Sequence, residues 1–73
     1  MKFSSIAVRE VVVEDTIVGW TIVGTFRGRG DKYVKCDIFG ELTVWHLRDN
    51  ALEDARQCRK HPGTLDYWRL LKC

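Results

Sequence analysis

The residues best suited to metal chemistry are two cysteines and two histidines. Cys58 and His61 stand three residues apart on one predicted helix. Cys36 and His46 are expected on one face of a predicted hairpin, and four such ligands suit a tetrahedral zinc site. No two cysteines have the close spacing of a zinc knuckle, however, and both Cys36 and Cys58 fall at predicted core positions. We therefore expect buried reduced thiols, with no metal and no cofactor.

The sequence offers little for catalysis. A nucleophilic cysteine or serine needs a histidine beside it and a third group that orients the histidine, and neither histidine has such neighbours in the predicted elements. The carboxylate pairs are typical of solvated residues in a turn (Glu14 and Asp15) and at a helix start (Glu53 and Asp54). We expect a protein that is not an enzyme.

Basic and aromatic side chains interleave in one stretch of the chain. Proteins hold single-stranded nucleic acid with cations along its backbone and aromatic rings against its bases, so this stretch suits such a site. The alternative is a basic loop whose charge only keeps the chain soluble. The candidate nucleic-acid contacts are Arg27, Arg29, Lys32, Tyr33 and Lys35.

Length and composition limit what the chain can be. Its 73 residues make one domain, and an apolar fraction of 45% with three Trp, three Phe and two Tyr supports a folded core. The net charge of +2 is too even to indicate nucleic acid by itself, whereas separate acidic and basic stretches suit protein recognition. Three cysteines are an odd number, no apolar run reaches the ~18 residues of a membrane span, and no signal peptide is recognised. We expect a cytoplasmic protein that binds no membrane.

Two long strands are predicted over residues 3–14 and 17–27, with a polar turn between them. The apolar positions of the first strand change parity, which predicts a β-bulge near Arg9 or a bend between two short strands. The second strand contains Gly19 and Gly24, which indicate strong coiling or the close approach of another backbone.

Residues 33–47 are predicted to form a hairpin that turns at Phe39-Gly40-Glu41. This register pairs Ile38 with Leu42, Cys36 with Val44 and Val34 with His46, and places all six on one face. The other face carries Tyr33, Lys35, Asp37, Thr43, Trp45 and Leu47.

Residues 50–61 are predicted to form the helix, with Asn50 as its N-cap and Glu53 at the capping-box position. Its apolar stripe is narrow and made of Ala51, Leu52, Ala55 and Cys58. Residues 64–72 alternate as a strand does but also fit helical spacing, and their Tyr and Trp favour a strand.

Together these elements predict an α+β fold, a single domain over residues 1–73. An antiparallel sheet of four to five strands carries one amphipathic helix packed on one face, in the order β-β-β-β-α-β. The predicted core consists of Val18, Trp20, Ile22, Val34, Cys36, Ile38, Leu42 and Val44.

Two surfaces are candidates for binding a protein. The second face of the predicted hairpin is more apolar than a solvated face requires, and the first strand is a long edge that could add to a partner's sheet. The alternative is that Trp45 and Trp68 pack on each other under the last segment. The candidate partner-binding residues are Lys2, Phe3, Arg9, Tyr33, Lys35, Trp45 and Leu47.

The layout of the chain resembles the small proteins that bacteriophages make to redirect host machinery. The likeness rests on size, on folded sequence almost from Met1, and on a strand–helix–strand ending over residues 50–72 with a Pro62-Gly63-Thr64 break. In length and element order the chain is most similar to RNA-polymerase-binding transcription regulators of Xanthomonas-infecting phage.

This resemblance implies a non-enzymatic regulator that acts in the host cytoplasm. Such a protein inhibits transcription initiation by displacing the σ factor, or acts as an antiterminator, through contacts to the N-terminal part of the β′ subunit and to the β flap. Anti-CRISPR proteins share the same style, so a host nuclease complex is the alternative partner. The likeness lies in the layout and assigns no contact residue.

Overall fold

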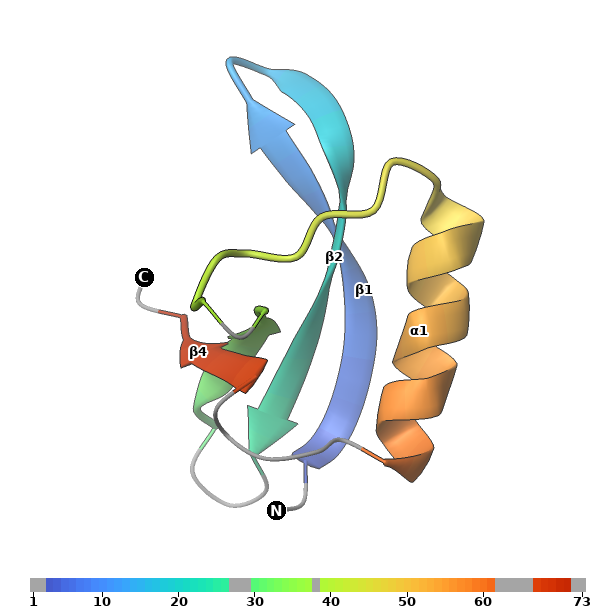
Figure 1. The fold of residues 1–73 in the computed structure, drawn as a ribbon. Helices are drawn as coiled ribbons and strands as arrows, with labels where there is room; N and C mark the ends of the chain where they lie inside the picture. The colour runs from blue at the N-terminus through green and yellow to red at the C-terminus, as the bar shows by residue number, and fades with distance from the viewer. Residues whose placement is uncertain (1–2, 27–29, 38, 62–66, 72–73) are drawn as a thin grey trace.

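The computed structural model describes residues 3–26, 30–37, 39–61 and 67–71, and within them one helix packs against an antiparallel sheet (Figure 1). The strands are β1 (Phe3–Val13), β2 (Thr16–Phe26), β3 (Lys32–Lys35) and β4 (Trp68–Leu70), and they lie in the sheet in this order. The helix α1 (Arg48–Lys60) falls between β3 and β4 in the sequence and packs against β1 and β2. The predicted α+β class is confirmed, and the order is β-β-β-α-β.

β1 and β2 form a long hairpin whose end projects beyond the rest of the molecule (Figure 1). Val13 pairs with Thr16, so the turn consists of two residues, Glu14 and Asp15, which have φ angles of 50° and 63°. Positive φ at both central residues is the type I′ geometry, which matches the twist of a two-stranded hairpin. The predicted polar turn is therefore confirmed.

The β-bulges lie away from the predicted place. The register between β1 and β2 shifts where Ser4 is the extra residue on β1 and where Val18 is the extra residue on β2. Arg9 pairs regularly with Thr21, so the prediction of a bulge near Arg9 is wrong. The pairing is regular from Ser5 to Val11, so the apolar side chains change face: Ile6 and Val8 lie on the face of Ile22, whereas Val11 lies on the opposite face with Arg9.

The predicted hairpin over residues 33–47 forms only in part. Asp37 N–H donates to the carbonyl of Glu41 (2.9 Å), and Cys36 bridges Leu42 rather than the predicted Val44. The carboxylate of Asp37 also accepts from the N–H groups of Phe39 (2.8 Å) and Glu41 (3.0 Å). This side-chain cap pulls the turn one residue earlier than predicted.

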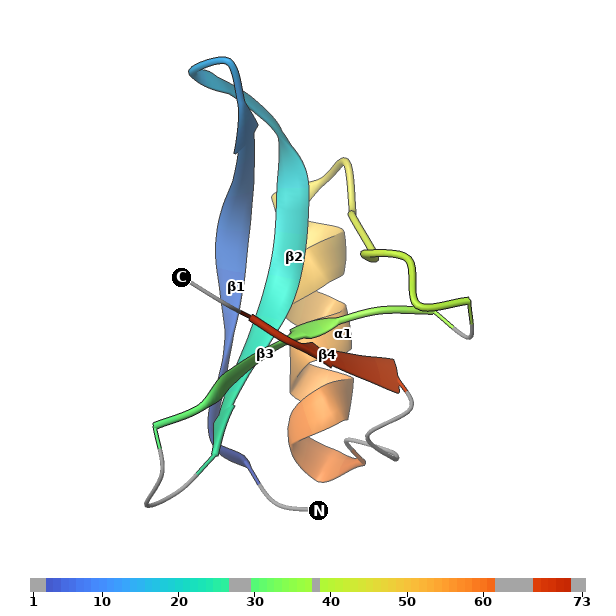
Figure 2. The ribbon, with the colours of Figure 1, turned by 90° about the vertical axis from the view of Figure 1, so that its left-hand side faces the viewer.

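After Thr43, whose N–H donates to the carbonyl of Lys35 (3.1 Å), the chain leaves β3 and lies beside β2. Trp20 and Trp45 exchange two backbone hydrogen bonds of 2.8 Å, and the hydroxyl of Thr21 donates to the carbonyl of Thr43 (2.8 Å). Apart from the bridges at Leu42 and Trp45, this segment forms no strand, which corrects the predicted fourth strand before the helix. Figure 2 shows β3 and β4 running across the direction of β1 and β2, so the sheet is strongly coiled.

The core lies between the helix and the sheet and consists of Ile6, Ile22, Ala55, Cys58 and Trp68. The predicted core is correct for Ile22, Val34 and Cys36, which are all buried. It is wrong for Val18 and Leu42, which are exposed, while Trp20 and Val44 are half-buried and Ile38 falls outside the described residues. Two features explain the failures: Val23 pairs with Val34, so Val34 lies on the opposite face of the sheet from Ile22, and Val18 is the bulged residue near the end of the β1–β2 hairpin.

The helix begins earlier than predicted. Its N-cap is Leu47, which makes no side-chain cap, and Asn50 lies within the helix, so the predicted capping box is wrong. The expected small stripe is confirmed for Ala51, Ala55 and Cys58, which are buried and let the helix lie close to the sheet. At 13 residues α1 is too short to span a bilayer, and the described chain holds no other helix that could do so.

One contact ties the end of the helix to β1. The guanidinium of Arg59 donates from Nε (3.2 Å) and Nη2 (2.9 Å) to the carbonyl of Ile6. That carbonyl belongs to the outer strand of the sheet, so Arg59 covers part of the edge at which another strand could pair.

Replacing Gly19 with alanine is expected to lower the free energy of unfolding by about 1–3 kcal/mol. A Cβ at this position would meet the side chain of Val44 and lie 2.8 Å from the carbonyl oxygen of Trp45, so it would force the segment off β2. Urea denaturation measures the loss. Ala7→Val is the control, because Ala7 is exposed on the neighbouring strand. Equal stability of the two variants would contradict the close approach at Gly19.

Candidate functional site

Phe3 and Tyr33, two of the predicted partner contacts, lie in an aromatic cluster. The ring of Phe3 packs 4.8 Å from that of Phe26 and 4.6 Å from that of Trp68, measured between centroids. The ring of Tyr33 lies 5.1 Å from Phe26 and 6.2 Å from Phe3. Both side chains are half-buried against the core. The structure therefore gives them a packing role.

Lys35 and Trp45 also lie on the core side. The ammonium of Lys35 stands 5.0 Å from the ring centroid of Tyr67 and 5.3 Å from that of Trp68, within range of a cation–π interaction. Trp45 is half-buried against the core cluster that contains Trp68. Of the residues predicted to form the outer face of the hairpin, Leu47 remains open, with 62% of its surface exposed.

The predicted nucleic-acid site is only partly described. Arg27 and Arg29 fall outside the described residues, as does Lys2 of the predicted partner-binding set. Lys32 is exposed, but the ring of Tyr33 already packs on two phenylalanines. A base could stack on that ring only if this packing opened.

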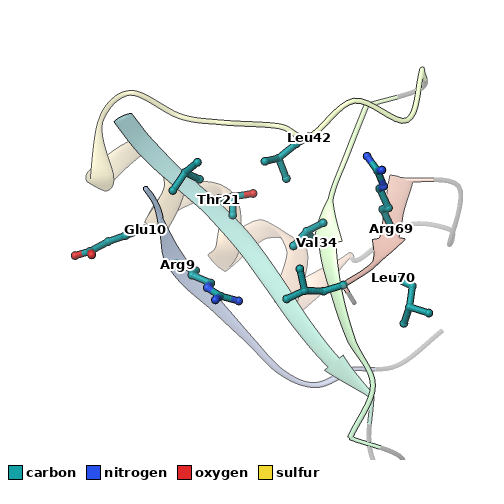
Figure 3. Close-up of a pocket in the computed structure, with 9 residues that line it drawn as sticks. Arg9, Glu10, Thr21, Val34, Leu42, Arg69 and Leu70 are labelled. Atoms are coloured by element: carbon teal, nitrogen blue, oxygen red, sulfur yellow. The ribbon is translucent and has the colours of Figure 1, made fainter. Parts of the chain in front are cut away.

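Arg9 is the predicted contact that the structure places at a hollow. The hollow measures about 740 Å³ and is lined by Arg9, Glu10, Val11, Thr21, Val34, Leu42, Arg69, Leu70 and Leu71 (Figure 3). Arg9, Thr21 and Val34 have the strand parity opposite to that of Ile22, so the hollow lies on the face of the sheet away from the helix. Its volume is that of sites which bind small molecules or short peptide segments.

A second hollow of about 350 Å³ adjoins the first. The two share Arg9 and Leu71, and the second adds Lys32 together with residues of β1 and β2. We call the two hollows together the sheet groove.

The rim of the sheet groove is cationic. Arg9 from β1 and Arg69 from β4 lie on opposite sides of the larger hollow, with Thr21 and Val34 between them (Figure 3). The carboxylate of Glu10 is directed away from the others (Figure 3). Within the described part of the chain, neither guanidinium makes an ion pair. Two arginines with no ion pair among the described residues therefore lie on opposite sides of the hollow.

The floor of the sheet groove is apolar. Val34 is 9% exposed, and Val11, Leu42 and Leu71 line the hollow around it. Thr21 is 4% exposed, and its hydroxyl is satisfied by the carbonyl of Thr43. The groove thus offers an occupant apolar contact below and guanidinium donors at the sides, which form paired hydrogen bonds to carboxylates.

The larger hollow holds no arrangement for nucleophilic catalysis among its described lining residues, which include no Cys, His or Ser. Across the described chain, no three His, Cys, Asp or Glu side chains gather as metal ligands. The cationic rim and apolar floor of the groove have the chemistry to accommodate an anionic, partly apolar group.

Sequence reasoning missed two features. Arg69 and Leu71 were not assigned to a site because the conformation of residues 64–72 was ambiguous in the sequence. The projecting end of the β1–β2 hairpin was read as ordinary strand, yet its aliphatic side chains are about half exposed: Val12 53%, Val13 54%, Ile17 49% and Val18 45%. The signal in the sequence is the run of aliphatic residues on both sides of Glu14-Asp15. In the structure the helix does not bury these side chains.

The thiols of Cys36 and Cys58 are both buried, as predicted. Burial raises the pKa of Cys58, the nearby ammonium of Lys35 lowers it, and the carboxylate of Asp54 raises it further. The net direction is upward, so the folded protein favours the neutral thiol.

Trp45→Ala is expected to lower the free energy of unfolding by about 2–4 kcal/mol, because the side chain packs on the core and leaves a cavity when truncated. Chemical denaturation followed by circular dichroism measures this loss. The matched control is Leu47→Ala, which truncates an exposed neighbour and should change stability by less than about 0.5 kcal/mol. A Trp45→Ala variant as stable as the control would contradict the packing role and favour the predicted partner-binding role of Trp45.

Stability should fall with rising pH through the titration of Cys58. Its pKa is higher in the folded than in the unfolded chain, so the folded state retains a proton that the unfolded state loses. The contribution is complete at neutral pH and declines as the pH rises beyond about 9. Unfolding free energies measured across this range should drop more steeply for the wild type than for Cys58→Ala. Parallel curves would exclude the effect.

No family model matches this chain, and no match was found among curated proteins or solved structures. The function proposed below therefore has two supports. One is the geometry of the sheet groove, and the other is the resemblance in chain layout described above.

Proposed function

We propose that this protein is a non-catalytic binding module that takes an acidic, aliphatic segment of a protein partner into the sheet groove. The observation that carries the proposal is the pair Arg9 and Arg69, two guanidiniums without described ion pairs on either side of an apolar floor. Carboxylates of the segment would pair with the guanidiniums, and an aliphatic side chain between them would cover Val34.

The chemistry of the groove favours a peptide over a nucleic-acid strand. Phosphates would also suit the arginines, but bases need aromatic faces on which to stack. The described lining of both hollows contains no Phe, Tyr or Trp. Apolar contact with aliphatic floor residues is what a Leu, Ile or Val side chain requires.

Bacterial RNA polymerase is the partner that we propose first. The support is the resemblance in length and element order to phage regulators of that enzyme, and the consequence would be inhibition of transcription initiation or antitermination. A host nuclease complex is the second choice, on the same kind of resemblance. The groove supplies the contact chemistry that either partner would meet.

The test uses a double charge reversal, Arg9→Glu with Arg69→Glu. Its affinity for purified Xanthomonas RNA polymerase, measured by biolayer interferometry, should be at least about ten-fold weaker than that of the wild type, because like charges now face the acidic segment. Inhibition of single-round transcription by the protein should decline in parallel.

The control is Arg56→Glu, on the exposed side of the helix, which changes the net charge by half as much as the double reversal. Arg56 is 64% exposed and pairs only with Glu53 (3.2 Å) among the described residues, so reversal there changes net charge without touching the groove. Equal loss in the control would mean that net charge and not the groove governs binding. If the wild type does not bind the polymerase at all, that partner is excluded.

A second measurement tests which chemical group the groove binds, without using the polymerase. Fluorescence anisotropy follows a labelled peptide of alternating glutamate and leucine, beside the same peptide with glutamine for glutamate and a thymidine oligonucleotide. The acidic peptide should bind the wild type best and the double reversal least. Preference for the oligonucleotide would support the nucleic-acid reading, and preference for the glutamine peptide would remove the role of the arginines.

A further inference from the structure

The projecting end of the β1–β2 hairpin has the chemistry that the sheet groove would accept. We call residues 12–18 the arm. Its aliphatic side chains, Val12, Val13, Ile17 and Val18, are 45–54% exposed, and Glu14 and Asp15 form its tip. Figure 1 shows the tip of the arm reaching past both the helix and the other strands.

Both faces of the arm are apolar. Val12 and Val13 are neighbours on a strand and therefore point to opposite faces, and both are more than half exposed. A flat surface can cover only one of these faces. A groove with walls, or a second arm beside the first, covers both.

The tip carries two carboxylates on a tight turn. Type I′ turns favour Gly, Asn and Asp because both central residues have positive φ, so Asp15 at 63° is a common residue there, whereas Glu14 at 50° is an unusual one. The turn thus presents the carboxylate of Glu14 at a conformational cost to the hairpin.

We propose that a second copy of this chain occupies the sheet groove, with the acidic, aliphatic arm of each copy lying in the groove of the other. Glu14 and Asp15 would meet Arg9 and Arg69, and the aliphatic side chains of the arm would lie on the floor around Val34. This inference rests on the proposed function, because it names an occupant of the same groove.

Charge complementarity favours a second copy of the chain over other binding partners of the arm. An anionic bilayer or a nucleic-acid backbone would be repelled by Glu14 and Asp15, although the aliphatic side chains alone would suit a membrane. The groove of a second copy offers Arg9, Arg69 and Lys32 together with an apolar floor. It matches both properties of the arm.

The position of the groove favours a reciprocal dimer over an open chain of copies. The groove begins at Arg9 and Val11, where the arm leaves the sheet. From Val11 to Asp15 the arm extends roughly 13 Å at about 3.3 Å per residue. If two copies are related by a two-fold axis and their arms lie side by side, the tip of each arm lies over the groove of the other copy. Such a symmetric contact forms a closed dimer and leaves no site for a third copy.

The dimer would regulate the proposed function. An arm in the groove excludes the acidic segment of another protein, so a partner must compete with self-association. Apparent affinity for the acidic peptide should therefore decrease as the concentration of the chain rises.

The test combines two complementary charge reversals. One variant carries Arg9→Glu with Arg69→Glu, and the other carries Glu14→Arg with Asp15→Arg. Sedimentation velocity at low salt should give the wild type twice the monomer mass of 8.5 kDa. Each variant alone should weaken dimerisation at least about ten-fold, because like charges meet at both contacts. An equimolar mixture of the two should form a heterodimer, since opposite charges meet again at both.

Arg56→Glu is the control and should remain dimeric. A wild type that sediments as a monomer at the highest concentration reached would overturn the proposal, as would a dimer that survives both reversals or a mixture that fails to associate. Circular dichroism of each variant shows whether it is folded, and the mixing experiment separates lost association from lost folding. A monomeric wild type that still binds the acidic peptide would remove the dimer and leave the proposed function standing.

Discussion

Two backbone hydrogen bonds between Trp20 and Trp45 set the shape of this small protein. They hold the chain that follows β3 against β2. The predicted hairpin after β3 is therefore short, and its second half pairs with β2 instead of β3. In this segment, residues 42–45, the Trp45 side chain packs against the core and Leu42 lines the groove. The approach is possible because Gly19 has no side chain in its path.

The small size of the chain explains why most of its aromatic side chains lie on the helix-covered face of the sheet, while arginine and aliphatic side chains lie on the open face. A domain of this length buries only about 60% of its unfolded surface, so its largest side chains are needed for the core. Phe3, Phe26, Tyr33 and Trp68 join in one aromatic cluster, and Trp45 packs against the same core. The open face is left with arginines and aliphatic residues. Its binding chemistry is therefore that of carboxylates and aliphatic groups.

The arm gathers four exposed aliphatic side chains at one end of the molecule. The helix packs along β1 and β2 and Arg59 covers the outer strand at Ile6, but neither reaches the end of the hairpin. Val12, Val13, Ile17 and Val18 are consequently half exposed in the single chain. Their burial requires another molecule, and the acidic tip beside them determines which surfaces can supply it.

Local patterns of apolar and turn residues were enough to predict the α+β class, the first two strands with their polar turn, the helix with its small buried stripe, and the buried thiols. They could not predict which faces meet, because the pairing of β2 with β3 is a contact between segments whose local sequence does not fix a common register. Val23 opposite Val34 turned Tyr33 and Lys35 inward, and β4 brought Arg69 across from Arg9, which stands sixty residues earlier in the chain. Period-two alternation tells which residues of one strand share a face, but only strand pairing tells which of those faces meets the helix.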